Sequence, residues 1–156
     1  MVCFIGEVGM PEDKFVRIIK FYCTLYQKGF RHLGNLLARM VRIFFSCDIP
    51  ASVVIGKGLH LPHYGLGVVI HPCTRIGDNC VIYQNVTIGV KYKGDKTFCC
   101  TLKDGVLIGC GAVILGTGEM VIGSNSKIGA NSVLFCSVPD NSTAVGIPAK
   151  NISNRK

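Results

Sequence analysis

The sequence predicts a mostly β protein, a parallel β-helix preceded by a short α-helical segment. Aliphatic residues recur every six positions in three runs: Ile76, Ile82 and Ile88; Leu102, Ile108 and Ile114; and Ile122, Ile128 and Leu134. Glycine directly follows an aliphatic residue at Gly56, Gly77, Gly89, Gly109, Gly123 and Gly129. A six-residue period matches neither an amphipathic helix nor a half-buried strand. It is typical of a solenoid in which each hexapeptide forms one short strand with its aliphatic side chain inward.

The length of 156 residues indicates one domain that can bury its own core. Trp is absent and aliphatic residues are abundant, so the core is expected to consist of stacked Ile, Val and Leu layers. We expect a helical segment over residues 1–46, the β-helix over residues 47–153 with a loop at 90–101, and a tail at 154–156.

Two helices are expected in the N-terminal segment. Pro11, Glu12 and Asp13 suit a first helical turn, and Gly29 suits a stop. A second helix is expected over about residues 30–45. Its apolar stripe consists of Leu33, Leu36, Leu37, Met40, Val41 and Phe44. We expect both helices to cap the open end of the β-helix and to bury their apolar stripes there.

The net charge of +8 is unevenly distributed along the chain. Residues 1–47 carry seven Lys or Arg against three acidic residues, and the much longer remainder of the chain carries ten against six. A basic surface can serve a phosphate-rich cofactor, an anionic membrane or nucleic acid. No nucleic-acid-binding motif accompanies the charge, so that partner is not expected. The alternative to a simple cap is a basic amphipathic segment in peripheral contact with a membrane.

Three features indicate a cytoplasmic protein. No apolar run reaches the ~18 residues that span a bilayer, and the first five residues lack the basic start of a secretory signal. The nine Cys are odd in number and lack a regular paired spacing. They therefore fit reduced thiols better than a disulfide framework.

The first irregularity in the repeat contains the candidate catalytic residue. From Leu61 to Ile70 the step is nine residues instead of six, and His63 lies within this slip. A neutral imidazole can remove the proton of a hydroxyl that attacks a thioester. Asp48 lies fifteen residues before His63, and three hexapeptides make a coil of eighteen, so Asp48 can lie on the neighbouring coil and orient the ring.

Simpler interpretations remain open for these residues. His63 can be a surface-loop residue, and Asp48 can merely cap the turn into the first coil. His60 and His63 have a spacing seen in metal sites, but no third ligand with convincing spacing accompanies them, so no metal is expected.

The second irregularity is a polar and basic insertion. From Ile88 to Leu102 the step is fourteen residues, eight more than the repeat requires. Such a loop in a regular solenoid is usually functional or mobile. A smaller excess of two residues lies between Ile114 and Ile122 and has no functional interpretation.

Three stretches together resemble the left-handed β-helix acyltransferases, specifically the serine acetyltransferase group. They are the hexapeptide run, Asp48-Ile-Pro-Ala-Ser followed by Gly-Leu-His-Leu-Pro-His63-Tyr-Gly, and the closing Ala144-Val-Gly-Ile-Pro-Ala-Lys150. The resemblance covers roughly residues 46–153. It implies an acetyl-CoA-dependent O-acetyltransferase in which His63 is the general base, Asp48 is its partner and the acceptor hydroxyl attacks directly.

The resemblance also implies where coenzyme A binds. An extended pantetheine arm needs small residues along the later coils, and Lys side chains can pair with its phosphate groups. By position the candidates are Gly89, Gly109, Cys110, Ala112 and Ala130, with Lys127 and Lys150 for the phosphates. Coil geometry alone is the simpler explanation of each Gly or Ala.

The acceptor site departs from the family pattern. The serine enzymes have an Arg-His pair where this chain has Lys96 and Thr97, and an Asp where this chain has Pro62. They also resemble this chain less at the N-terminus, where their helical domain is longer. These differences favour a sugar hydroxyl of a surface polysaccharide or its precursor as acceptor, with L-serine as the alternative.

The exposed faces and ends of a solenoid favour packing against further copies. The resemblance implies a homotrimer with its active sites in the clefts between subunits. Two other classes of function remain on this scaffold, a zinc carbonic anhydrase and a non-catalytic module. The Asp48 and His63 pair and the missing third metal ligand favour the acetyltransferase.

Overall fold

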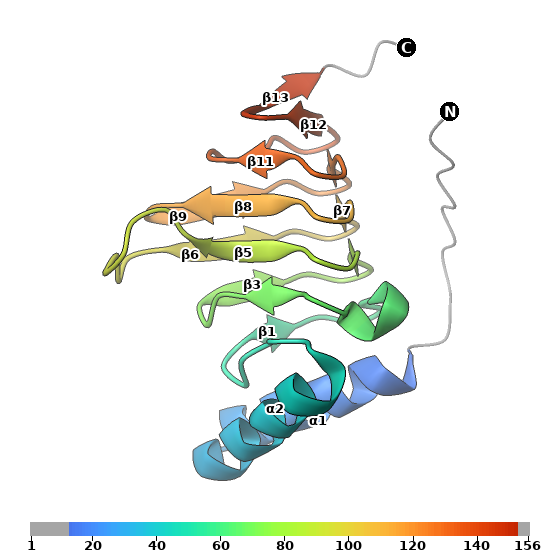
Figure 1. The fold of residues 1–156 in the computed structure, drawn as a ribbon, viewed down its shortest axis with the longest axis vertical. Coiled ribbons are helices and arrows are strands. Elements are labelled where there is room, and N and C mark those ends of the chain that lie inside the picture. Colours follow the sequence, from blue (N-terminus) through green and yellow to red (C-terminus); the bar gives the residue numbers. More distant parts are fainter. Residues whose placement is uncertain (1–12, 153–156) are drawn as a thin grey trace.

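The computed structural model describes residues 13–152, which form three parallel β-sheets wound around a common core beside a helical hairpin. Figure 1 shows the coils stacked into a column, with the hairpin across the end where the column begins. The helices are α1 (Lys14–Gln27) and α2 (Arg31–Phe45), and a short 3-10 helix, η1 (Pro62–Gly65), interrupts the coils. Within residues 13–152, no helix has the length and apolar character needed to cross a membrane.

Each sheet forms one face of a three-sided column. The first sheet contains β1 (Val54–Ile55), β3 (Thr74–Ile76), β6 (Cys99–Leu102) and β9 (Glu119–Ile122). The second contains β4 (Val81–Ile82), β7 (Leu107–Ile108), β10 (Lys127–Ile128), β12 (Thr143–Gly146) and β13 (Ala149–Ile152). The third contains β2 (Val69–Ile70), β5 (Thr87–Val90), β8 (Val113–Gly116) and β11 (Val133–Leu134). All pairs are parallel except β12 with β13, so the predicted parallel β-helix is confirmed.

The coils keep register across the irregularities that the sequence predicts. Val69 pairs with Thr87, which lies three hexapeptides further along the chain. Val54 pairs with Arg75 instead of Pro72, because the slip at η1 lengthens that coil beyond three hexapeptides. Ile76 pairs with Leu102 instead of Gly94, because the coil between them includes the polar insertion. The extra residues therefore leave the coils without shifting the strands.

The corners of the coils are built from Asn and Gly in left-handed backbone conformation. Asn79, Asn85, Asn125, Asn131 and Asn141 all have φ between 54° and 59°. Asn tolerates this region because its short polar side chain can form local hydrogen bonds. At the paired position in the adjoining coil, a Cβ on Gly58 would overlap Oδ1 of Asn79, so only glycine fits there.

The two helices pack unequally on the first coil. The side chain of Asp13 caps α1 by accepting a hydrogen bond from the amide of Phe15 (3.1 Å), so α1 begins at Lys14 rather than at Pro11, which lies outside the described residues. The hydroxyl of Tyr22, on the buried side of α1, donates to the carbonyl of Ile49 (2.8 Å) and ties the helix to the coil.

The second helix buries much less of its apolar stripe than predicted. Only Gly34 and Val41 of α2 are buried, and a Cβ on Gly34 would lie 2.9 Å from the carbonyl oxygen of Tyr22. Glycine at this position therefore permits the close crossing of the two helices. Leu37 of the predicted stripe is half-buried and packs against the core. The exposed apolar side chains include Leu33, Leu36, Met40 and Phe44 of the predicted stripe together with Ile43.

A substitution in the aliphatic core tests the stacked-coil packing. Ile108 is fully buried between coils, so Ile108→Ala is expected to lower the free energy of unfolding by about 2–5 kcal/mol through lost burial and a residual cavity. Ile43→Ala, at a 76% exposed side chain, is the matched control and should change stability by less than about 0.5 kcal/mol. Denaturant titration of both variants measures the difference, and equal effects would contradict the packing described.

Candidate active site

His63 lies on a left-handed turn that interrupts the coils between β1 and β2. His63 and Tyr64 have φ values of 57° and 56°, and both side chains are exposed. Such backbone conformations cost roughly 1–2 kcal/mol for each non-glycine residue, so other contacts must hold the turn. The turn presents the imidazole to solvent at the edge between the second and third sheets.

The helical hairpin supports this turn. The Tyr64 ring packs edge-on against Phe15 of α1, with ring centroids 5.7 Å apart, and against Phe45 of α2 at 6.1 Å. The amide of Gly67 donates to the carbonyl of Ser46 (2.8 Å), directly after α2. The N-terminal helices therefore position the candidate catalytic residue, which the sequence alone did not indicate.

Asp48 lies on the third sheet, next to the end of α2. Its backbone pairs with Val69 instead of Leu66, because the slip at η1 makes this coil longer than the three hexapeptides assumed from the repeat. Its carboxylate Oδ2 lies 3.3 Å from Nη1 of Arg42. Among residues 13–152, no hydrogen bond or ion pair joins Asp48 to His63, so their pairing stays a prediction.

A small open cavity adjoins the Asp48 carboxylate. Its volume is about 190 Å³, and its polar lining comes from Asn35, Arg39, Arg42 and Asp48. His63 is not part of the lining. The environment of Asp48 is thus set by two Arg side chains of α2.

The long insertion leaves the column between β5 and β6. Within it, Oδ1 of Asp95 accepts hydrogen bonds from the Thr97 amide (2.8 Å) and hydroxyl (2.6 Å). The hydroxyl contact is the main cause that holds the pKa of Asp95 below its usual range. Lys96 is exposed, so its ammonium group is presented outward beside an ordered turn.

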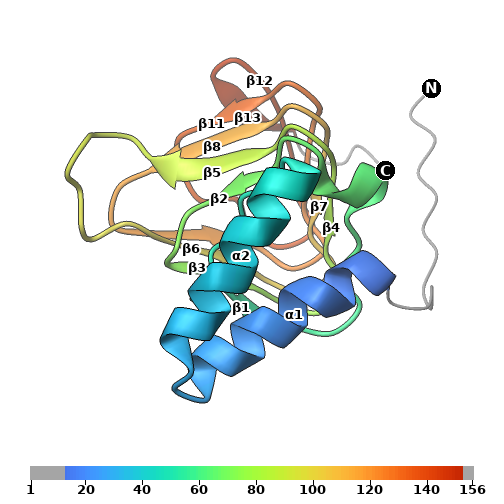
Figure 2. The ribbon, with the colours of Figure 1, turned by 60° about the horizontal axis from the view of Figure 1, so that its bottom comes forward.

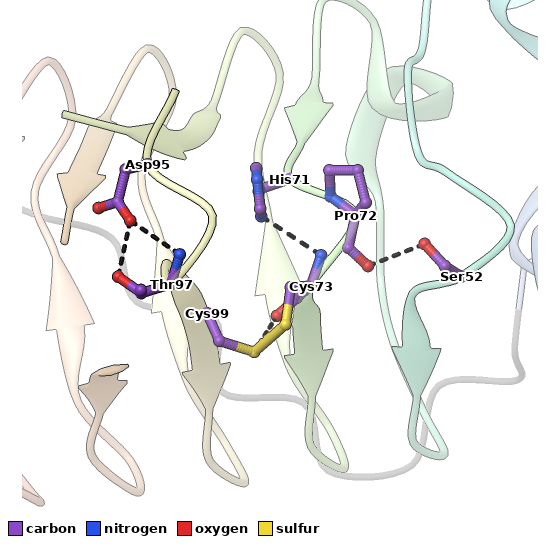
Figure 3. Close-up of a disulfide and its surroundings, with 7 residues drawn as sticks. All are labelled: Ser52, His71, Pro72, Cys73, Asp95, Thr97 and Cys99. Carbon is purple, nitrogen blue, oxygen red and sulfur yellow. Dashed lines mark hydrogen bonds between the residues drawn. A yellow bond between two sulfur atoms is a disulfide. The ribbon is translucent and has the colours of Figure 1, made fainter. Parts of the chain in front are cut away.

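A disulfide closes the base of this insertion, as Figure 3 shows. Cys73 and Cys99 are bonded across adjacent coils, with Cα atoms 4.9 Å apart. Beside them the buried Phe98 ring packs against His71 at 5.1 Å, and Nδ1 of His71 accepts a hydrogen bond from the Cys73 amide (3.3 Å). Partial burial lowers the pKa of His71, and Asp95 opposes that shift. The expectation that all cysteines are reduced thiols is therefore wrong for this pair.

The spacing in the sequence contains the signal for this disulfide. Cys73 and Cys99 are separated by 26 positions, the same separation as that of the paired residues Ile76 and Leu102. Each Cys lies three residues before its aliphatic partner, so the register places the two side by side. The prediction of reduced thiols considered only the spacing of cysteines along the sequence and not the register of the coils. It therefore did not include the Cys73–Cys99 disulfide.

The remaining cysteines give no candidate nucleophile in the core. Burial raises the pKa of the thiols of Cys23, Cys47 and Cys100 to about 12 and that of Cys80 to about 11. A thiol with such a pKa is almost entirely protonated near neutral pH and is a poor nucleophile. Within residues 13–152, no group of three or more His, Cys, Asp or Glu side chains is arranged to hold a metal ion.

The predicted coenzyme residues mostly gather on the edge that carries His63. Gly109 and Cys110 lie in the corner between the second and third sheets two coils beyond that of η1, and Ala130 lies in the corner three coils beyond it. Lys127 and Lys150 lie on β10 and β13 of the adjoining second sheet. Ala112 is fully buried, so its side chain belongs to the core rather than to a ligand surface.

The predicted acceptor residues divide between two edges. Pro62 is the first residue of η1, beside His63. Lys96 and Thr97 lie on the insertion, at the edge between the third and first sheets, and Gly89 lies on β5 just before it. Figures 1 and 2 show the insertion and η1 projecting from opposite sides of the column. One chain therefore does not bring Lys96 and Thr97 to His63.

Comparisons with known proteins identify the family. The chain is 40% identical over 127 residues to serine acetyltransferase from Bacillus subtilis (strain 168), covering 81% of this chain and 57% of that protein. It is 39% identical over 132 residues to serine acetyltransferase from Helicobacter pylori (strain ATCC 700392 / 26695), covering 83% of this chain and 74% of that protein. The chain belongs to the serine acetyltransferase family. No protein-family model matches it.

Solved structures of serine acetyltransferases have the same fold. The enzyme from Neisseria gonorrhoeae, in complex with serine, matches with a TM-score of 0.77 and 36% identity, covering 87% of this chain and 54% of that one. The enzyme from Brucella abortus strain S19, in complex with coenzyme A, matches with a TM-score of 0.81 and 34% identity, covering 88% of this chain and 54% of that one. The predicted left-handed parallel β-helix with a short helical segment is confirmed.

These comparisons correct the predicted acceptor. The expectation of a surface-polysaccharide sugar is wrong, because the relatives and structural neighbours are serine acetyltransferases. That expectation rests on Pro62, Lys96 and Thr97 and on the short helical segment. The chain spans 57% and 56% of the Bacillus subtilis and Staphylococcus xylosus relatives.

The disulfide gives a test of how the insertion is anchored. Cys99→Ser is expected to lower the free energy of unfolding by roughly 3.5 kcal/mol, the chain-entropy value for a cross-link between positions separated by 26. Reductant should destabilise the wild type similarly and leave the variant unchanged. Cys136→Ser, at an exposed thiol outside the disulfide, is the control and should unfold like the wild type with and without reductant. If the denaturation midpoint of the wild type is the same with and without reductant, the cross-link is contradicted.

Proposed function

We propose that the protein transfers the acetyl group of acetyl-CoA to the hydroxyl of L-serine. Family membership supports this proposal, and the observation that carries it is the placement of His63. This exposed imidazole lies on the same edge of the column as Gly109, Cys110 and Ala130. Direct transfer to a hydroxyl requires a general base close to the thioester. His63 and the predicted coenzyme A residues share one edge, as this reaction requires.

In the proposed reaction, His63 removes the proton of the serine hydroxyl as the oxygen attacks the thioester carbonyl. The tetrahedral intermediate then collapses, coenzyme A leaves as the thiol, and the proton held by His63 neutralises the leaving sulfur. Backbone amides along the coil corner can stabilise the oxyanion. No acyl-enzyme is required, because the hydroxyl attacks the thioester carbonyl directly.

Asp48 is proposed to orient His63 and to stabilise its protonated form. In the structure its carboxylate instead contacts Arg42, with 67% of the Arg42 side chain exposed. An exposed ion pair of this kind is weak and exchangeable, typically up to about 1 kcal/mol. Asp48 can therefore turn from Arg42 toward the imidazole when substrate binds, without a large cost.

The acceptor site is proposed to use Lys96 in place of the Arg of the family pattern. The exposed Lys96 ammonium would pair with the serine carboxylate, while Thr97 orders the turn through Asp95. Lys binds a carboxylate as a point charge rather than as a bidentate fork. A weaker and less selective acceptor site is the expected consequence.

A homotrimer with shared active sites is proposed for the assembly. Support comes from the separation of the insertion from the His63 turn within one chain (Figure 2). Packing the insertion of one subunit against the neighbouring subunit's His63 edge would complete the site. A closed ring of three satisfies this head-to-tail contact for every subunit.

The catalytic role of His63 has a direct test with a matched control. His63→Ala is expected to lower kcat for O-acetylserine formation by roughly 10²–10⁴-fold, because the hydroxyl loses its general base. His60→Ala removes a half-buried His from the same coil and should retain activity. Product is measured by mass spectrometry, which the protein thiols do not disturb. Serine left unacetylated by the wild type, or equal rates for wild type and His63→Ala, would contradict the proposal.

Complementation tests whether one site uses two chains. His63→Ala and the double variant Lys96→Ala/Thr97→Ala should each be nearly inactive alone. Co-expressed as mixed oligomers, they should regain part of the wild-type activity, because some sites combine an intact His63 edge with an intact insertion. Mixing the purified variants without subunit exchange is the control and should stay inactive. If the co-expressed variants regain no activity, each active site takes His63 and the insertion from the same chain, and the shared-site proposal is wrong.

A further inference from the structure

We propose that the outer face of the helical hairpin binds the surface of an anionic phospholipid bilayer. This inference goes beyond acetyl transfer and does not depend on it. The outer face is defined by six exposed apolar side chains of the hairpin, namely Phe21, Leu33, Leu36, Met40, Ile43 and Phe44. The hairpin combines this exposed apolar area with basic side chains and with no acidic residue between positions 14 and 47.

The apolar character of this face follows from the one-sided packing of the hairpin. Leu36, Met40 and Ile43 are spaced at i, i+4 and i+7, so they lie on one side of α2. They are 55%, 46% and 76% exposed, and Phe44 beside them is 74% exposed. On α1, the side opposite the buried residues contributes Phe21, which is 60% exposed.

The position of this face leaves it open among the described residues. The hairpin lies across the first coil at the end of the column, and no other described element covers its far side (Figures 1 and 2). Contiguous exposed apolar surfaces of this kind mark interaction sites in soluble proteins. An amphipathic helix with such a face and a basic polar side typically lies in a membrane interface.

The charge of the hairpin decides which partner fits. Residues 14–47 contain seven Lys or Arg and no Asp or Glu. These are Lys14, Arg17, Lys20, Lys28, Arg31, Arg39 and Arg42. A second copy docked face to face would bring together two sets of like charges. An anionic lipid surface instead attracts those that lie near it, at about 1 kcal/mol for each Lys or Arg. Arg42 is the exception, because it is paired with Asp48.

The geometry also fits a shallow interfacial contact rather than insertion. Within residues 13–152 no helix is long and apolar enough to cross a bilayer. The apolar side chains of the outer face are exposed, and so are the basic side chains at the hairpin turn, Lys28 and Arg31. Long Lys and Arg side chains commonly bridge apolar and polar environments.

Vesicle co-sedimentation of the full chain tests the proposal. The protein should sediment with vesicles of phosphatidylcholine mixed with phosphatidylglycerol and should remain in solution with phosphatidylcholine alone. Raising the salt from about 0.1 M to about 1 M shortens the Debye length from about 10 Å to about 3 Å and should release most of the protein. Binding that is equal on both vesicle types, or absent from both, would overturn the proposal.

Two pairs of matched variants separate the apolar and charge contributions. Ile43→Ser/Phe44→Ser should weaken vesicle binding by about tenfold through lost apolar burial. Ile147→Ser/Ile152→Ser, exposed apolar residues at the opposite end of the column, should not. Lys28→Gln/Arg31→Gln should weaken binding by about 30-fold at low salt. Lys57→Gln/Lys93→Gln, with one residue on the column and one on the insertion, should have little effect.

Two further measurements separate lipid binding from misfolding and from self-association. Far-ultraviolet circular dichroism should show that all four variants retain the wild-type fold, since every substituted side chain is exposed. Light scattering reports the oligomeric state of each variant. Two results together would contradict the membrane proposal: the wild type does not bind anionic vesicles, and Ile43→Ser/Phe44→Ser dissociates a larger assembly. The outer face would then bind another copy of the chain.

Discussion

The structure depends on the requirement that each coil return to the register of the coil beneath it. Ile76 pairs with Leu102 although the coil between them contains the long insertion, and Val54 pairs with Arg75 across the η1 slip. A shift by one residue would turn inward aliphatic side chains to solvent and outward ones into the core. Extra residues are therefore tolerated only where they project from an edge. This constraint concentrates chemical variation in η1 and in the insertion.

The same constraint divides the proposed active site. The His63 turn projects from the edge between the second and third sheets, and Lys96 lies on the edge between the third and first. Because the paired strands of the third sheet lie between these two edges, neither edge can approach the other within one chain. Proposed catalysis therefore depends on contact between subunits, and the disulfide between Cys73 and Cys99 fixes the point from which the insertion reaches out. Anchoring the base of the insertion limits the positions that Lys96 can sample.

Periodic features of the fold could be predicted from sequence, whereas contacts between elements could not. The six-residue period predicted the parallel strands and the extra residues in two coils, because register depends only on spacing. It did not reveal the ion pair of Asp48 with Arg42, since helix packing is not periodic. The sequence also did not predict that most of the apolar stripe of α2 is exposed, because the spacing of apolar residues does not reveal which other element packs on them. The predicted acceptor was wrong because it rested on differences at Pro62, Lys96 and Thr97, whereas the similarity to the Bacillus subtilis and Helicobacter pylori serine acetyltransferases extends over 127 and 132 residues.

The helical hairpin has two faces with different roles. Its inner side holds the strained turn of His63 through contacts of Phe15 and Phe45 with Tyr64. Its outer face carries Phe44, the residue next to Phe45, on the exposed side of α2. Energetic coupling between two sites requires an element with two discrete arrangements. The contacts that cap α1 at Asp13 and tie it to the first coil at Tyr22 do not involve the outer face. Membrane contact would therefore set where the enzyme works without changing how His63 is held.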